Sequence, residues 1–308
     1  MTSPFGHMRL ITTPTAGRGR DPVLPRLRRA LDERGLEHDV VATEDRGHAT
    51  ALARAAVTEH DLRYIVAVGG DGTVHEVVNG LVDPDRGALR EDLVLGVVPA
   101  GSGTDFVRTF GLRLSPERIA GHLDGDGLYP IDIGRARLTG LDGEPRSLVF
   151  ANIADVGYAA TVVDRAERFP RFLGKLRYLI GTFAAIRTFE LQQGRVALDH
   201  TEQEGRYSNV VVANGQFFGG AMKVAPRAIP DDGRFNVQLW GGSPRDVFLM
   251  TNRVRRGDHL GHDEVQEYQS GRVEVETAEP VLVEADGEIV GRTPAVFDLL
   301  EKAIALKI

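Results

Sequence analysis

The sequence predicts a two-domain protein, with an α/β domain first and a domain rich in β-strands second. The chain has 308 residues, which is long for one core and sufficient for two. Helical patterns alternate with short apolar segments in the first part of the chain, which is typical of a parallel sheet. From Leu128 onward, apolar segments alternate with turns, as in antiparallel sheets. We therefore place the boundary near Tyr129, with domains 1–129 and 130–308.

The composition is that of an ordinary globular protein, with 42% hydrophobic and 26% charged residues. The net charge of −7 argues against a general nucleic-acid binder. The absence of cysteine excludes disulfides, thiolate metal sites and cysteine nucleophiles, and agrees with a cytoplasmic protein. No apolar run approaches the ~20 residues that cross a bilayer, and no secretory signal pattern opens the chain, so we expect no transmembrane segment.

The first domain is expected to place its ligand site at the carboxyl ends of its parallel strands. The predicted elements are strands at 9–13, 38–43, 63–68 and 93–98, and helices at 22–34, 47–60, 106–110 and from Ser115. Thr13, Thr43 and Asp71 fall at strand ends of this kind. Thr43 could equally be a residue that leads into the next helix.

A glycine turn at Gly69–Thr73 is the most informative stretch of the first domain. The β-branched run 65–68 stops at two glycines, and a helical pattern follows, which predicts strand, tight turn and helix. Glycine lets the backbone N–H groups approach a bulky anion, and the helix directs its positive end to the same place. Asp71 would repel phosphate directly, so it makes sense as a ligand for a divalent cation or as a group that orients a hydroxyl beside the phosphates. The alternative is a plain turn with Asp71 as the helix N-cap.

Gly69-Gly70-Asp71-Gly72-Thr73 resembles the signature of the diacylglycerol kinase catalytic-domain family, a segment that NAD kinases and phosphofructokinases share in similar form. A second glycine loop at 99–106 resembles the lipid-kinase pattern Pro-x-Gly-Thr-x-Asn-Asp-Phe, with Ser102 and Thr104 as departures. NAD kinases differ in this second segment, so the resemblance favours a lipid kinase. Residues 13–17 resemble the family's Asn-Pro-x-Ser-Gly, with Thr13 and Ala16 substituted.

The resemblance implies ATP as the phosphate donor, together with Mg²⁺. Because Ala16 lacks a hydroxyl group, a phosphate contact there would have to come from a backbone N–H. The residues that the resemblance implies for nucleotide binding are Thr13, Pro14, Thr15, Ala16, Gly17, Thr43, Gly69, Gly70, Asp71, Gly72, Thr73 and Ser102.

The second domain resembles the β-sandwich of the same family at 152–157 and 211–220. The implied fold is an N-terminal Rossmann-like α/β domain and a C-terminal β-sandwich, with the active site in the cleft between them. Around 222–235 the resemblance implies that Asp232 binds Mg²⁺ through its side chain, with carbonyl groups from Ile229 and Arg234. On its own, Asp-Asp-Gly is more often a simple turn.

Asp286-Gly287-Glu288 resembles the family's catalytic tripeptide, so Glu288 inherits the role of general base. Asp71 would organise the phosphates, and Asp105 would be a supporting catalytic carboxylate. An identical tripeptide occurs at 142–144, but no buried strand leads into it. We interpret that copy as a hairpin turn.

We expect an ATP-dependent lipid kinase that transfers the γ-phosphate to the hydroxyl group of a lipid such as diacylglycerol. A kinase for a soluble substrate such as NAD is one alternative. A catalytically silent nucleotide-binding regulator is another, because Ala16, His75 and Thr104 depart from the family pattern. No motif fixes which lipid is phosphorylated.

The segment 165–187 mixes arginines and a lysine with aromatic and aliphatic residues. Such a mixture suits contact with an anionic membrane, although a pair of core helices with solvated arginines explains most of these residues slightly better, and both can hold for different faces. The expected partners are ATP and a lipid at the membrane surface, with no nucleic acid, and a homodimer is left open. We expect a cytoplasmic protein that associates peripherally with the inner membrane surface.

Overall fold

The computed structural model describes residues 3–14, 23–101, 104–112, 114–169 and 176–308. The chain divides into two compact units. The first comprises Met1–Ile133 and Leu300–Ile308, and the second comprises Gly134–Leu299. Within the described ranges, every helix is too short or too polar to span a bilayer.

The first unit is an α/β domain in which strands and helices alternate. Its elements are β1 (Met8–Thr12), α1 (Val23–Glu33), β2 (His38–Ala42), α2 (His48–Thr58), β3 (Tyr64–Gly69), α3 (Asp71–Leu81), β4 (Val82–Asp83), β5 (Gly87–Ala88), β6 (Val94–Pro99), α4 (Asp105–Thr109) and α5 (Pro116–Asp124). Strands β2, β1, β3 and β6 lie in this order and are all parallel. The predicted parallel sheet is confirmed.

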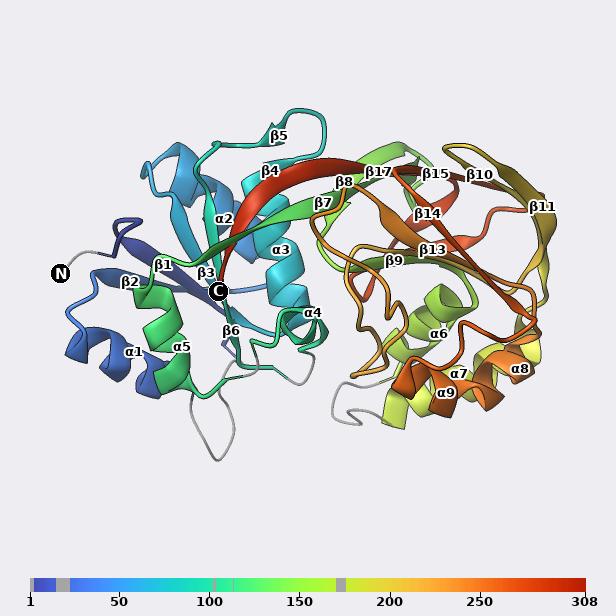
Figure 1. Cartoon of the computed structure of the whole chain (residues 1–308), viewed down its shortest axis with the longest axis horizontal. Coiled ribbons are helices and arrows are strands. Elements are labelled where there is room, and N and C mark those ends of the chain that lie inside the picture. Colours follow the sequence, from blue (N-terminus) through green and yellow to red (C-terminus); the bar gives the residue numbers. More distant parts are fainter. Residues whose placement is uncertain (1–2, 15–22, 102–103, 113, 170–175) are drawn as a thin grey trace. The chain divides into compact units, whose positions relative to one another are not determined.

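Helices cover both faces of this sheet (Figure 1). Alternate residues of a strand point to opposite faces. Met8 and Leu10 of β1 therefore join a buried cluster with α1 and α5, to which Leu27 and Leu123 contribute. Helices α2 and α3 pack against each other and against β1 and β3. Strands β1, β3 and β6 are thus buried on both sides, which explains their continuous apolar sequences, whereas the edge strand β2 is only half-buried.

The described residues of the second unit form antiparallel strands and the helices α6 to α9. Its elements are β7 (Leu128–Thr139, from Gly134 onward), β8 (Pro145–Phe150), β9 (Ile153–Gly157), α6 (Tyr158–Glu167), α7 (Leu176–Thr188), β10 (Gln192–Leu198), β11 (Glu202–Tyr207), β12 (Asn209–Ala213), β13 (Phe235–Trp240), α8 (Pro244–Leu249), α9 (Thr251–Arg256), β14 (Val265–Ser270), β15 (Arg272–Thr277), β16 (Leu282–Ala285) and β17 (Glu288–Lys307). The predicted β-sandwich is confirmed, and its core includes Phe150, Phe235 and Phe297, which are fully buried.

Strand β17 is a single strand of 20 residues. Lys302 adopts a left-handed conformation with φ 48°, but the strand continues through it. The amide of Lys302 donates a hydrogen bond of 2.7 Å to Oδ1 of the fully buried Asp132. Beyond this point Ala305 and Leu306 pair in parallel with β6 of the first unit. The last residues therefore extend the parallel sheet.

Candidate functional site

The parallel strands of the first unit end at one edge. Thr12 of β1 pairs with Ala42 and with Val68, and Gly69 of β3 pairs with Pro99 of β6. The residues that directly follow these strands therefore share this edge. They include Thr13, Pro14, Thr43 and the run Gly69–Thr73, as the sequence predicts. Thr15, Ala16, Gly17 and Ser102 lie outside the described residues.

The two glycine loops pack backbone against backbone. A Cβ atom on Gly101 would lie 2.7 Å from the Cα of Gly70, and one on Gly69 would lie 2.2 Å from Oγ1 of Thr73. Ala100 N donates a hydrogen bond of 2.9 Å to Gly69 O. Contacts this close exclude any side chain at Gly69 or Gly101 without movement of the loops. The glycines therefore allow the two loops to form one compact surface.

The carboxylate of Asp71 links the first glycine loop to the second. It accepts hydrogen bonds from Asp105 N at 3.1 Å and from Phe106 N at 3.0 Å. Asp71 therefore caps α4, while Gly70 occupies the N-cap position of its own helix α3. The alternative that Asp71 is merely the cap of its own helix is wrong. Two oxygens with several lone pairs leave room for a cation as well.

The N-terminus of α3 is suited to an anion. No side chain of the described residues caps this helix, so none competes there for its first-turn N–H groups. These groups and the helix dipole favour negative charge. Asp105 lies close by, is 5% exposed, and has an ion pair of 3.5 Å with Arg108. The arrangement combines an anion site with two half-buried or buried carboxylates.

Glu76 is a supporting residue that the sequence analysis does not identify. Its carboxylate accepts hydrogen bonds from Gly47 N at 2.9 Å and from Ala49 N at 3.1 Å. These are the first amides of α2, so a side chain of α3 caps the neighbouring helix. Thr43 lies in the loop that leads to this cap. A cap supplied from a different helix leaves no local sequence pattern, which is why it goes unpredicted.

In the second unit, Glu288 follows a two-residue hairpin turn between β16 and β17. Asp286 has φ 52° and Gly287 has φ 93°, which is the Asp-Gly combination favoured in tight hairpins. Ala285 pairs with Glu288 across the turn. Glu288 is half-buried at the first position of β17. The turn therefore fixes the backbone position from which the side chain of Glu288 extends.

Asp286 anchors this hairpin to the β8–β9 connection. Its carboxylate accepts hydrogen bonds from Ala151 N at 2.9 Å, Asn152 N at 2.9 Å and Ile153 N at 3.2 Å. The twin Asp142 instead accepts only from the nearby Glu144 N, at 3.1 Å, among the described residues. The 142–144 copy forms the exposed β7–β8 hairpin, as predicted. The two identical tripeptides therefore differ in structure: Asp286 binds the backbone of a distant segment, whereas Asp142 binds only its own turn among the described residues.

The family-like stretches at 152–157 and 211–220 meet beside this anchor. Asn214 Nδ2 donates to Ala151 O at 2.9 Å, and Asn152 Nδ2 donates to Phe217 O at 2.7 Å. Asn214 N and Gly215 N both donate to Asn152 O at 2.9 Å. Together with the bonds that Asp286 accepts, they join three segments far apart in the sequence. They make the base of the Glu288 hairpin rigid.

The predicted metal loop is a tight turn before β13. Oδ1 of Asp232 accepts from Arg234 N at 3.0 Å, and Asp232 N donates to Ile229 O at 3.5 Å. Among the described residues no three acidic or histidine side chains gather as they would around a metal. A cation here would depend on one carboxylate, backbone carbonyl oxygens and water. Such all-oxygen donors suit a hard cation like Mg²⁺.

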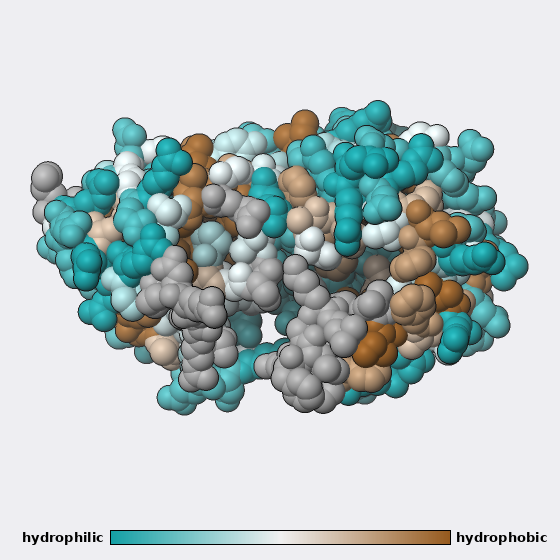
Figure 2. All heavy atoms as spheres, turned by 90° about the horizontal axis from the view of Figure 1, so that it is seen from below, coloured by the Kyte–Doolittle hydropathy of each residue, from teal (hydrophilic) through white to brown (hydrophobic). Residues whose placement is uncertain are grey.

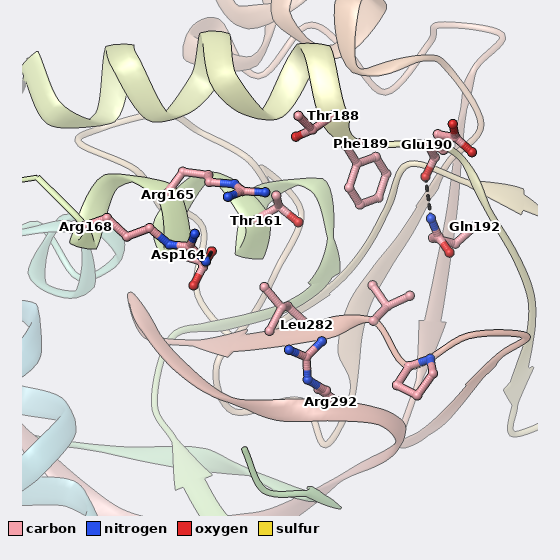
Figure 3. Close-up of a pocket in the computed structure, with 12 residues that line it drawn as sticks. Thr161, Asp164, Arg165, Arg168, Thr188, Phe189, Glu190, Gln192, Leu282 and Arg292 are labelled. Carbon is pink, nitrogen blue, oxygen red and sulfur yellow. Dashed lines mark hydrogen bonds and ion pairs between the residues drawn. The ribbon is translucent and has the colours of Figure 1, made fainter. Parts of the chain in front are cut away.

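The second unit also contains a cavity of about 440 Å³ beneath α6 (Figure 3). Arg165 of α6 and Arg292 of β17 point into it, and neither has an acidic partner among the described residues. Arg168 pairs with Asp164 at 2.7 Å. The remaining lining residues are Thr161, Thr188, Phe189, Glu190, Gln192, Pro280, Val281 and Leu282. Arginines beside an apolar wall suit a molecule with a polar, hydrogen-bond-accepting head and a hydrocarbon tail.

The described parts of the 165–187 segment form the end of α6 and most of α7. Ala166 and Ala185 are buried between these packed helices, whereas Phe183 is 52% exposed. The ring of Phe183 lies 5.7 Å from that of Phe248 in α8, next to Leu249, which is 67% exposed. Figure 2 looks onto this helical face and shows apolar atoms in brown among polar ones.

Two family models cover most of the chain. The diacylglycerol kinase catalytic domain matches residues 7–136. The YegS C-terminal NAD kinase beta sandwich-like domain matches residues 152–308. The two matches fall on the parallel-sheet domain and on the β-sandwich.

Two curated relatives are similar to the chain in sequence, and a solved structure is similar to it in fold. The chain is 31% identical over 304 residues to the Bacillus subtilis protein named "Putative lipid kinase YtlR", covering 94% of this chain and 96% of that one. It is 29% identical over 294 residues to the diacylglycerol kinase of Bacillus subtilis, covering 94% and 92%. A solved structure named "A putative diacylglycerol kinase from Bacillus anthracis str. Sterne" has the same fold, with a TM-score of 0.76, 22% identity, and coverage of 99% and 98%.

Proposed function

The chain belongs to the diacylglycerol kinase family, and we propose that it transfers the γ-phosphoryl group of ATP to the hydroxyl group of a lipid such as diacylglycerol. The observation that carries this proposal is the carboxylate of Asp71, held by the amides of the second glycine loop beside an uncapped helix N-terminus. Phosphoryl transfer depends mostly on positioning and charge neutralisation, and this loop pair offers both.

We assign the triphosphate of ATP to the glycine-loop surface. Backbone N–H groups at the start of α3 would bind phosphate oxygens, and Asp71 would hold Mg²⁺ next to them. We assign Asp105 as the supporting carboxylate, because the hydrogen bond from its backbone N–H to the carboxylate of Asp71 holds the two residues next to each other. Thr13, Pro14 and Thr43 lie at the same sheet edge and would contact the nucleoside. The expected contributions of Thr15, Ala16, Gly17 and Ser102 are part of the same proposal.

Glu288 is the general base in this proposal. Its carboxylate would accept the proton of the attacking lipid hydroxyl, a step worth roughly 10²–10⁴-fold in rate. The support is the anchored hairpin, which holds Glu288 at the start of a strand while Asp286 ties the turn to three amides. A base must keep its position to within hydrogen-bond distance, and this turn is built for that.

The lipid acceptor is proposed to use the cavity beneath α6. Its arginines would face the polar end of a lipid, and Phe189, Val281 and Leu282 would contact its hydrocarbon part. A soluble dinucleotide such as NAD gains little from an apolar wall. The direct test offers diacylglycerol in vesicles and NAD in separate reactions with ATP. Phosphorylation of the lipid alone supports the proposal, and phosphorylation of NAD alone contradicts it.

We propose that Mg²⁺ also binds at Asp232, with the carbonyl groups of Ile229 and Arg234, and stabilises the second unit. Asp232→Ala should lose most of the rise in melting temperature that Mg²⁺ gives the unchanged protein, and its activity should fall, because ligand binding stabilises only the state that binds. Differential scanning fluorimetry with and without Mg²⁺ measures the rise. Asp231→Ala, at the next residue, is the matched control. Equal Mg²⁺ responses in all three proteins would refute this site.

We propose that the exposed apolar side chains of α7 and α8 dock on an anionic membrane. Phe183→Ser with Leu249→Ser should lower binding to anionic vesicles by about 10-fold, because two exposed apolar side chains lose their contact with lipid. Vesicle sedimentation measures the binding. The control Leu141→Ser removes a side chain that is 58% exposed on the β7–β8 hairpin and should change nothing. If the double variant binds like the control, the membrane contacts another surface.

The arginines of α8 and α9 add a charge component to the same docking face. Arg245, Arg253 and Arg255 are exposed, and the first turn of α9 carries no acid. Cations at a membrane surface are attracted to anionic lipids over roughly 10 Å at 0.1 M salt. Binding by the unchanged protein should therefore weaken as salt rises and should be weaker on neutral vesicles.

A further inference from the structure

Two buried carboxyl groups face each other beneath the hairpin that presents Glu288. Asp155 of β9 and Glu284 of β16 are directly opposite residues of antiparallel strands, and they are 1% and 0% exposed. Their neighbours Ala154, Val156 and Val283 belong to the sandwich core. Because side chains alternate along a strand, the two acids point to the other face of the sheet, towards α6.

The two acids hold backbone amides on opposite sides of the pair. Oε1 of Glu284 accepts a short hydrogen bond from Gly287 N, within the turn that precedes Glu288. Oδ1 of Asp155 accepts a hydrogen bond of 3.0 Å from Ala160 N, in the first turn of α6. Oε2 of Glu284 is buried and has no hydrogen-bond partner among the described residues. A bare carboxylate oxygen in such a place is costly, and a proton on it removes the cost.

No cation of the described residues compensates the pair. Among the described residues no arginine, lysine or histidine forms an ion pair with Asp155 or Glu284. The other charged group that acts on Glu284 is Asp286, which is also acidic. On the α6 side the backbone amide of Ala160 binds Asp155, and β12 places Val211 opposite Asp155. Two carboxylates in this environment cannot both be charged.

We propose that Asp155 and Glu284 share a proton, carried on Glu284, and that this pair is a positioning device for the catalytic hairpin. In this arrangement Glu284 accepts from Gly287 N with one oxygen and donates its O–H towards Asp155 with the other. The proton locks the Asp286–Gly287 turn and so fixes Glu288. The positioning role rests on the proposed function of Glu288 as the base, whereas the shared proton does not.

The directions in which the pKa values of Asp155 and Glu284 are shifted agree with this arrangement. Burial raises the pKa of Asp155 to about 7. Burial, together with the nearby Asp155, raises the pKa of Glu284 well above its ordinary value. In the unfolded chain both groups lose their protons near pH 4, so the folded state binds more protons above that pH. The free energy of unfolding therefore decreases as pH rises from about 4 through 7 and beyond.

Two substitutions of Glu284 separate the effect of its hydrogen bonds and proton from the effect of the side chain's volume. Glu284→Gln keeps an acceptor for Gly287 N and a donor for Asp155, so it imitates the protonated acid without titrating. Glu284→Leu keeps the volume and loses both bonds. We expect Glu284→Leu to lower kcat about 10–100-fold while the KM for ATP stays within about twofold, because a loosened turn misplaces the base. Glu284→Gln should have a normal kcat at neutral pH. It should keep this kcat at alkaline pH, where the kcat of the unchanged protein falls.

Two further measurements need no kinase activity. The melting temperature of Glu284→Gln minus that of the unchanged protein should be larger at pH 9 than at pH 5, by about 3 °C or more. Hydrogen exchange at the amide of Gly287 should become faster in Glu284→Leu and stay slow in Glu284→Gln. Glu279→Gln, at an exposed position before β16, is the control and should match the unchanged protein throughout.

These readouts keep two failures apart. If the unchanged protein phosphorylates no lipid, the proposed function fails, while the melting and exchange series still decide the shared proton. Equal pH dependence of melting in Glu284→Gln and the unchanged protein would overturn the shared proton. Normal kcat and normal Gly287 exchange in Glu284→Leu would overturn the positioning role.

Discussion

Asp71→Ala is expected to reduce lipid phosphorylation by at least about 10²-fold, because it removes the carboxylate that we propose organises the phosphates and Mg²⁺. The structure adds a second reason. The variant also loses the bonds from Asp105 N and Phe106 N, so the second glycine loop is no longer tied to the first. Loss of such a cap costs about 1 kcal/mol of folding free energy, so the protein should still fold. Steady-state kinetics and thermal melting measure the two effects.

Asp83→Ala is the matched control for this variant. Oδ1 of Asp83 accepts from Asp85 N at 3.0 Å and from Arg86 N at 3.1 Å, in the β4–β5 turn. The control therefore removes the same kind of aspartate cap away from the glycine loops. It should lose a similar amount of stability and keep its activity. Activity in Asp71→Ala that equals the control would refute the assigned role of Asp71.

Glu288→Gln is expected to lower kcat by roughly 10²–10⁴-fold, because an amide keeps the shape and hydrogen bonding of glutamate but takes no proton. ATP binding and the melting temperature should stay close to those of the unchanged protein. Asp286 and Glu284 hold the turn, and the substitution touches neither of them. Single-turnover kinetics with ATP and lipid measures the chemical step directly.

The twin tripeptide supplies the internal control. Glu144 is exposed in the β7–β8 hairpin, and its aspartate neighbour makes only a local bond to its backbone among the described residues. Glu144→Gln should therefore be nearly silent. If Glu144→Gln were the inactive variant, or if both variants stayed active, Glu288 would not be the base.

The order of elements in the first domain could be predicted because each has a local signature. Apolar runs mark the buried parallel strands, and the predicted strand at 63–68 corresponds to β3 (Tyr64–Gly69). The predicted helix at 22–34 corresponds to α1 (Val23–Glu33), which ends before Gly35 with φ 66°. The turn between β3 and α3 is also where the glycines predict it. Local steric demands of this kind are visible in sequence.

Contacts between distant segments could not be predicted in this way. Nothing near Asp71 in the sequence shows that its carboxylate caps α4, and nothing near Asp286 shows that it binds the amides of 151–153. The last residues of β17 look like an ordinary apolar strand, yet they pair in parallel with β6. Each of these depends on the folded arrangement rather than on local pattern.

The buried acid pair left a weak signal that could have been used. Asp155 interrupts an otherwise small and apolar run at 153–157, and Glu284 ends the apolar run that leads to Asp286-Gly287-Glu288. A charged residue inside a predicted buried strand calls for a partner. Sequence cannot show that the two interruptions lie opposite each other, because the register between β9 and β16 is set by the whole sheet.

The most direct test of the proposed activity is phosphate transfer from γ-³²P-labelled ATP to a mixed lipid extract. We expect the label to enter the lipid fraction as a phosphomonoester, only when Mg²⁺ is present, and to be absent with Asp71→Ala. Identification of the labelled lipid by mass spectrometry then names the acceptor. Label that appears only in water-soluble products such as phosphorylated NAD, or ATP binding with no transfer to any lipid, would contradict the account.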